Sequence, residues 1–205
     1  MPDTLMFKQL FCTALAVALL AATPRVYTTR YDVRRFHDCN AAAFYAADHP
    51  LVGLYRYRFQ ARFVGTTITH VPSLGYRGSA RIMYSLAPGQ STIVLPRWSW
   101  PDMSASQRET LGDFADALRN HEIGHVEIAL AGIAGRTSTI TVLGQSFAQT
   151  KAMLQSAGDN QLNSLASEVL RTEKTYDRVT GHGTEQVEGP SYGFRGGENV
   201  KFGCR

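Results

Sequence analysis

Residues 106–132 read SQRETLGDFADALRNHEIGHVEIALAG and predict one long amphipathic helix. Ser106 and Glu109 have the spacing of a capping box, and Gly132 or Gly135 marks the end of the helix. The residues that recur at intervals of three and four are Leu111, Phe114, Leu118, His121, His125 and Ile128. This period places two histidines on the same face as the apolar residues, so we expect them to point towards the interior.

The half of the chain before this helix is rich in predicted strands. Residues 55–63 read YRYRFQARF, which alternates aromatic with arginine side chains and is typical of a half-buried strand. Its arginines form either a solvated sheet face or a binding stripe. Further strands are expected at 26–33, 80–86 and 91–96, the last two joined by a turn at 87–90. Together they predict a small, largely antiparallel sheet.

The half after the helix continues with helical patterns. Two further helices are expected at 144–156 and 160–175, and from Gly181 onward the sequence is glycine-rich and aperiodic. The predicted class is therefore α+β, with a small sheet followed by a long helix and further helices. The size of 205 residues and the hydrophobic content of 44% suit one domain with an ordinary core.

The N-terminal segment resembles an export signal. Lys8 precedes the apolar stretch LFCTALAVALLAA, which is short for a bilayer span and ends in small residues. We therefore expect a signal peptide at 1–23, a single domain with a C-terminal tail at 24–205, and a periplasmic or secreted protein. No membrane span is then expected after cleavage, and the alternative is an uncleaved anchor.

The cysteine content and the net charge limit which compartments and partners we expect for this chain. With Cys12 inside the signal, Cys39 and Cys204 remain, and two thiols in an oxidising compartment usually pair, so we predict a disulfide between them. The formal net charge is +4 and the arginines are scattered along the sequence, so no nucleic-acid partner is expected. No feature predicts an oligomeric state.

Candidate chemistry lies in the stretch His121-Glu122-Ile123-Gly124-His125. Histidines four apart on a helix can bind one Zn²⁺ ion, and the intervening Glu122 is placed to act as a base towards a metal-activated water. Gly124 inside a helix indicates a close approach by another group. The alternative is a pair of core-edge histidines satisfied by carboxylates or carbonyls. Glu127 points away from this face and is expected to be solvated.

A third zinc ligand is expected from the polar stretch YDRVTGHG at 176–183, read as a loop after a helix. His182 is favoured because Gly181 and Gly183 allow a tight backbone turn that brings its side chain to an ion. Asp177 is the alternative ligand, or a residue that orients a ligand histidine. Tyr176 either donates its hydroxyl to the oxyanion formed in catalysis or is a packed aromatic at the helix end.

The HEIGH helix and the YDRVTGHG stretch together resemble a bacterial domain-of-unknown-function family described as predicted secreted zinc-dependent proteases. The resemblance covers residues 26–185 and includes every position of the pattern Tyr-Asp-x-x-Thr-x-His-Gly. It implies a zincin-like metallopeptidase domain with Zn²⁺ as cofactor and a peptide or protein substrate.

Two functions from different classes follow from these patterns. One is a zinc-dependent metallopeptidase that hydrolyses a peptide bond, and the other is a noncatalytic envelope protein with a structural metal site and a partner-binding surface. Glu122 favours the enzyme, because a structural zinc site has no need of a carboxylate beside it. Trp98 and Trp100 either line a cleft or pack where a strand meets a helix, and packing is preferred. The other histidines, His37, His49 and His70, match no ligand spacing.

Overall fold

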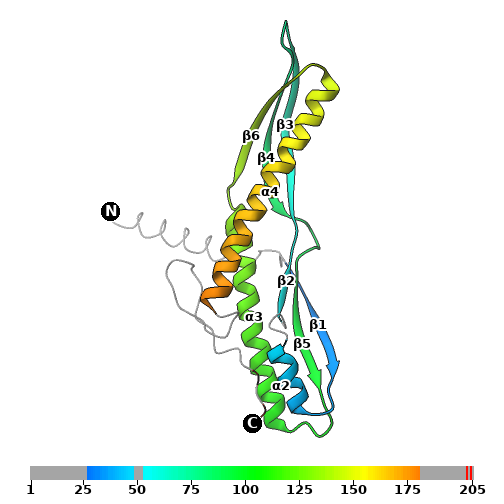
Figure 1. Ribbon diagram of the computed structural model, residues 1–205, viewed down its shortest axis with the longest axis vertical. Coiled ribbons are helices and arrows are strands. Elements are labelled where there is room, and N and C mark those ends of the chain that lie inside the picture. The colour runs from blue at the N-terminus through cyan, green and yellow to red at the C-terminus, as the bar shows by residue number, and fades with distance from the viewer. Residues whose placement is uncertain (1–26, 49–52, 181–201, 203, 205) are drawn as a thin grey trace, which may run out of the picture.

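Two small sheets lie end to end along an elongated molecule, and the two longest helices run antiparallel beside them (Figure 1). The computed structural model describes residues 27–48, 53–180, 202 and 204. The elements in chain order are β1 (Thr28–Arg35), α2 (Cys39–Asp48), β2 (Leu54–Arg56), β3 (Phe59–Val71), β4 (Gly75–Leu86), β5 (Thr92–Ser99), α3 (Ala105–Ile133), β6 (Thr137–Gly144) and α4 (Phe147–Val179). The predicted α+β class is confirmed.

The first sheet has the order β1-β5-β2 and is mixed rather than antiparallel. Strand β1 pairs parallel with β5, while the short strand β2 pairs antiparallel with the other side of β5. Helix α3 packs on this sheet through a core that includes Ile93, Leu95, Trp98, Phe114 and Leu118. Strand β2 therefore lies at the sheet edge, close to the middle of α3.

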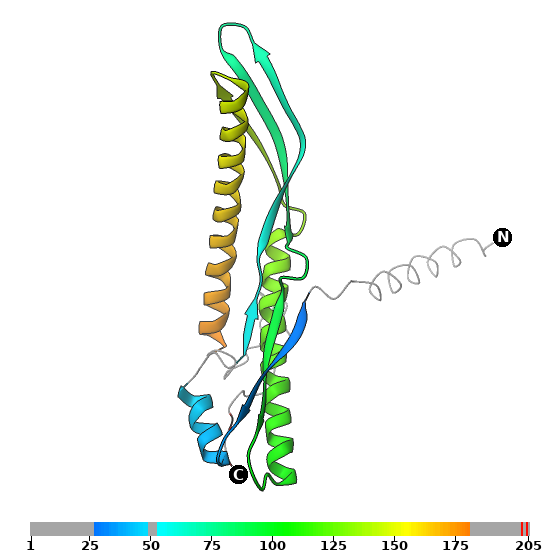
Figure 2. The same cartoon turned by 90° about the vertical axis from the view of Figure 1, so that its right-hand side faces the viewer.

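The second sheet has the antiparallel order β3-β4-β6. The N-terminal half of α4 covers one of its faces, as the side view also shows (Figure 2). Ala80, Ile82, Ile140 and Leu154 form the small core between them. The C-terminal half of α4 continues past this sheet and packs on α3.

Helix α3 agrees with the prediction except at its first turn. Its N-cap is Ser104, and the capping box is formed with Gln107 rather than by Ser106 and Glu109. The Gln107 side chain is fixed there because its Oε1 atom also accepts a hydrogen bond from Trp100 Nε1. The helix ends at Ile133, as the glycines predicted.

The prediction of two separate helices after α3 was wrong, because 147–179 form the single helix α4. Gly158 does not break it. A Cβ atom at Gly158 would lie 3.0 Å from Cε1 of the Phe63 ring. The glycine therefore lets β3 pack closely on the helix. Tyr176 and Asp177 consequently project from the last turns of a helix and not from a loop.

The predicted strand 55–63 was also wrong as a single element. Its alternating burial is present, with Tyr55 and Phe59 buried and Arg56 and Arg58 exposed. However, Tyr57 and Arg58 carry the chain from one sheet to the other, so the two ends belong to β2 and β3. Strand β6 and helix α2 were not predicted.

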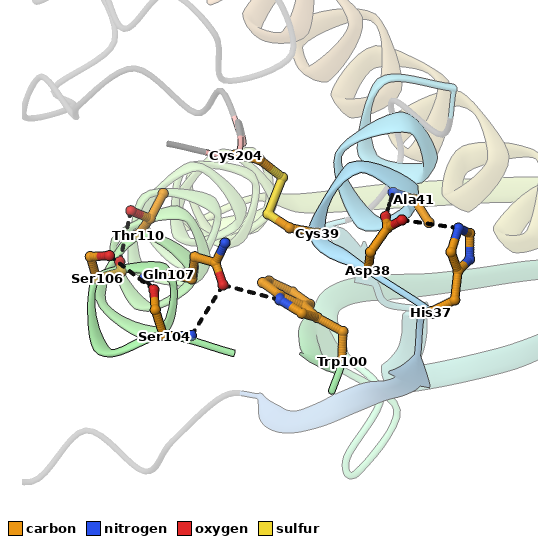
Figure 3. Close-up of a disulfide and its surroundings, with 10 residues drawn as sticks. All are labelled: His37, Asp38, Cys39, Ala41, Trp100, Ser104, Ser106, Gln107, Thr110 and Cys204. Atoms are coloured by element: carbon orange, nitrogen blue, oxygen red, sulfur yellow. Dashed lines mark hydrogen bonds and ion pairs between the residues drawn. A yellow bond between two sulfur atoms is a disulfide. The ribbon is translucent and has the colours of Figure 1, made fainter. Parts of the chain in front are cut away.

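A disulfide joins Cys39, the first residue of α2, to Cys204, as predicted (Figure 3). The two Cα atoms are 5.8 Å apart. Two residues before Cys204, the Phe202 ring packs against Trp98, Trp100 and Phe114. Both tryptophans are thus buried in the core at the meeting of β5 and α3, which confirms the packing interpretation.

The predicted signal peptide at 1–23 lies outside the described residues, and the boundary of the 24–205 domain stays a prediction. Within the described part of the chain, no helix combines the length and the apolarity needed to cross a bilayer.

Candidate metal centre

The two histidines of α3 converge on one carboxylate oxygen of α4. His121 Nε2 lies 3.3 Å from Asp177 Oδ1, and His125 Nε2 lies 2.9 Å from the same atom. All three side chains are largely shielded from solvent, with exposed fractions of 4%, 12% and 25%. The predicted pair of histidines on the inner face of the helix is therefore present, and Asp177 faces it directly.

These three residues could hold a metal ion. Their ligand atoms lie within 4.8 Å of one another. Ligands about 2.0–2.1 Å from a tetrahedral ion are separated by about 3.3 Å, which is close to the distances from Asp177 to each imidazole. One oxygen of Asp177 faces both Nε2 atoms, an arrangement that suits hydrogen bonds to the two rings as well as a shared ion. Two imidazoles and one carboxylate form a donor set that leaves a coordination position open.

The same grouping shifts the pKa values of its members. Burial alone would raise the pKa of Asp177, but hydrogen bonds from His121 and His125 outweigh it and hold the pKa well below its ordinary value. Burial lowers the pKa of His125, yet the hydrogen bond to Asp177 and the negative charge of Glu122 raise it overall. Asp177 is therefore ionised and available as an anionic ligand.

Glu122 lies beside the cluster without being part of it. Its side chain is buried, and this burial raises the pKa to about 7, although the His125 charge and a hydrogen bond from the Tyr55 backbone act in the opposite direction. A carboxyl group with a pKa near neutrality can accept and release a proton at physiological pH.

Glu173 is a further carboxylate of the site that the sequence analysis did not single out. It lies one helical turn before Asp177. Its buried Oε1 atom is 4.0 Å from His125 Nδ1 and has no hydrogen-bond partner among the described residues. Burial raises its pKa, which a hydrogen bond from the Tyr57 hydroxyl partly offsets. The spacing of Glu173 and Asp177 is the same four residues that separate the histidines. That signal was missed because the helix was expected to end at residue 175.

A cavity of about 180 Å³ opens onto these groups. Its walls come from the edge strand β2 and from both long helices. The lining residues are Gly53, Leu54, Tyr55, Leu118, His121, Glu122, His125, Leu170, Glu173, Lys174 and Asp177. A ligand in the cavity would therefore touch the sheet edge and the histidine–carboxylate cluster together.

A family described as "Bacterial protein of unknown function (DUF922)" matches residues 58–183 of this sequence. The match covers more than half of the 205 residues. The chain belongs to this family. The matched region runs from β3 to just beyond α4 and contains both predicted motifs, although it is narrower than the predicted 26–185. Neither the curated proteins nor the solved structures contain a match to the chain.

In this DUF922 protein, Tyr176 is packed against the cluster. Its ring stacks on the His121 ring, with centroids 4.9 Å apart, and its hydroxyl donates to the His121 carbonyl oxygen at 3.3 Å. Burial, and next the negative charge of Glu122, raise its pKa, so the hydroxyl remains protonated. The packed arrangement is thus observed, and the role towards an oxyanion stays a prediction.

Gly124 provides the space for this tyrosine. A Cβ atom at Gly124 would lie 2.6 Å from Tyr176 Cζ, so the close approach predicted from the glycine is confirmed. We expect Gly124→Ala to destabilise the DUF922 protein by about 1–3 kcal/mol, because the methyl group overpacks the contact between α3 and α4. Urea unfolding measures the change in the free energy of unfolding.

Gly112 offers a matched control on the same helix, because a Cβ atom there would have no atom within 4 Å from any other described part of the chain besides its own helix backbone. Gly112→Ala should stabilise the protein by up to about 1 kcal/mol through helix propensity alone. Equal free energies of unfolding for the two variants would contradict the proposed role of Gly124.

The remaining candidate residues are exposed, packed elsewhere or outside the described residues. Glu127 is exposed, as expected. His182 and His49 lie outside the described residues, so the assignment of a zinc ligand to His182 stays a prediction. His37 contacts Asp38 at the surface, and His70 packs against the Tyr76 ring, both far along the chain from the metal centre.

Proposed function

We propose that this chain is a zinc-dependent metallopeptidase of the zincin type that hydrolyses a peptide bond. One observation supports the proposal most directly. The ligand atoms of His121, His125 and Asp177 lie within 4.8 Å of one another, and the buried Glu122 lines the same cavity. Zinc held there would act as a Lewis acid on a water molecule and on the substrate carbonyl.

The chain's own residues supply the rest of the chemistry. Glu122 accepts a proton from the attacking water while the water oxygen forms a bond to the carbonyl carbon. Glu122 then donates this proton to the leaving amine when the C–N bond breaks. The pKa of about 7 suits both directions of transfer. Among the described residues strand β2 pairs with β5 alone, and its other edge could pair with an extended peptide.

Export to the periplasm or the medium is part of the proposal. The Cys39–Cys204 disulfide is typical of proteins that fold in an oxidising compartment, which supports the signal-peptide interpretation of residues 1–23. The noncatalytic alternative keeps the metal as a structural element. It gives no reason for a buried Glu122 with a raised pKa beside an open cavity.

Metal analysis of ligand variants tests the assignment. We expect the purified protein to contain about one zinc ion and to lose peptidase activity reversibly with a chelator. His121→Ala, His125→Ala and Asp177→Ala should each weaken zinc binding by more than the roughly 10- to 100-fold typical of residues that only orient a ligand. Zinc affinity is measured by competition with a chromogenic chelator.

His37→Ala is the matched control, because it removes an exposed histidine elsewhere and should leave zinc affinity unchanged. His182→Ala tests the sequence prediction directly, and loss of zinc in that variant would make His182 an additional ligand. Unchanged zinc affinity in Asp177→Ala would contradict the proposed ligand set.

A further inference from the structure

The second sheet and the first turns of α4 form one end of the molecule (Figure 1). We call this region the sheet lobe and define it as β3, β4, β6 and residues 147–158 of α4, a segment that ends one residue before Asp159. Neither aspartate nor glutamate occurs in any of these segments, which carry the basic side chains Arg62, Arg77, Arg81 and Lys151. The fold thus brings together in one lobe four basic residues that are separated in the sequence.

The three arginines lie on one face of the sheet. Arg77 and Arg81 alternate along β4 with Gly78, Ala80 and Ile82, and these three are buried towards α4. The arginines therefore point away from the helix. Arg62 of β3 pairs with Met83, which places it on the same outer face. Among the described residues, no carboxylate forms an ion pair with any of the three.

Large apolar side chains are exposed at the outer end of the same lobe. Leu74 in the β3–β4 turn is 51% exposed, Leu143 is 45% exposed and Phe147 is 54% exposed. They lie close together, because Gly75 approaches the Gly144 backbone and Leu143 pairs with Arg77. The turn and the start of α4 form one end of the long axis in both views (Figures 1 and 2). Apolar side chains grouped at one extremity offer a contact surface for a partner with an apolar region.

We propose that this end of the sheet lobe docks on an anionic lipid surface. Leu74, Leu143 and Phe147 would enter the headgroup region while the arginines of the outer face contact lipid phosphates. A soluble polyanion would satisfy the arginines alone and leave the three apolar side chains in water, so the combination favours lipid. The inference does not depend on the proposed peptidase activity.

Co-sedimentation with vesicles tests the proposal on the exported, processed chain. We expect binding to phosphatidylcholine vesicles that contain phosphatidylglycerol, little binding to phosphatidylcholine alone, and weaker binding as salt rises. Because each arginine near such a surface contributes roughly five-fold, the triple variant Arg62→Gln/Arg77→Gln/Arg81→Gln should bind about 100-fold more weakly. Leu74→Ser/Phe147→Ser should lose the binding that persists at high salt.

Arg30→Gln/Arg35→Gln/Arg56→Gln is the matched control, because it removes the same charge from exposed residues of the other sheet. All variants share one N-terminus, so differences among them report on the sheet lobe, and thermal unfolding verifies that each is folded. Equal losses in both triple variants would overturn the proposal. So would binding to dextran sulfate that matches binding to the vesicles and is unaffected by Leu74→Ser/Phe147→Ser, since the partner would then be a soluble polyanion.

Discussion

Glu122→Gln is expected to retain zinc and to lose peptidase activity. The substitution preserves the shape of the side chain and its ability to accept the hydrogen bond from the Tyr55 backbone, but it cannot take a proton. Loss of a general base typically costs on the order of 10²- to 10⁴-fold in rate. The buried site already tolerates a neutral group there, because burial raises the pKa of Glu122 to about 7. Parallel measurements of zinc content and kcat/KM check the prediction.

Glu127→Gln is the matched control, since it makes the same change on an exposed face of the same helix, five residues further along. It should leave both zinc content and kcat/KM unchanged. If Glu122→Gln cleaved substrate as fast as the parent, Glu122 would not be the base. If it lost zinc together with activity, the carboxylate would instead contribute to metal binding.

The part of the site on α3 could be predicted because it depends only on helical period. A spacing of four residues places His121 and His125 on one face, whatever the rest of the fold does. The part on α4 depends on the same period. The period could be applied to Asp177 only if the helix was known to extend to Val179. The sequence analysis placed a break between 156 and 160, and the contact with Phe63 explains why Gly158 stands inside one continuous helix.

The arrangement of the sheets could not be predicted in the same way. Alternation in 55–63 correctly indicated which side chains are buried, because extended chain alternates in either sheet. It carried no information about the change of partner at Tyr57 and Arg58, which depends on long-range pairing with β5 and β4. The clustering of basic residues on the sheet lobe also depends on long-range strand pairing. Arg62, Arg77 and Arg81 are separated in the sequence, and strand register alone brings them to one face.

Removal of the Cys39–Cys204 disulfide is expected to cause the largest loss of stability of any change considered. The bond spans a sequence separation of 165 residues, for which the chain-entropy estimate is about 5 kcal/mol. It also holds Phe202 against Trp98 and Phe114 in the larger core. The double variant Cys39→Ala/Cys204→Ala avoids a free thiol, and urea unfolding under non-reducing conditions measures the change in the free energy of unfolding.

Reduction separates the effect of the bond from the effect of the side chains. Treatment of the parent with dithiothreitol should lower its urea midpoint to about that of the double variant, while the double variant should not respond, because it has no bond to lose. Metal content should be the same in the untreated parent and the double variant, since neither cysteine is among the lining residues of the cavity that contains His121 and Asp177. Equal midpoints for the parent and the double variant, or two free thiols in the mass spectrum of the unreduced protein, would show that the bond does not contribute to stability in solution.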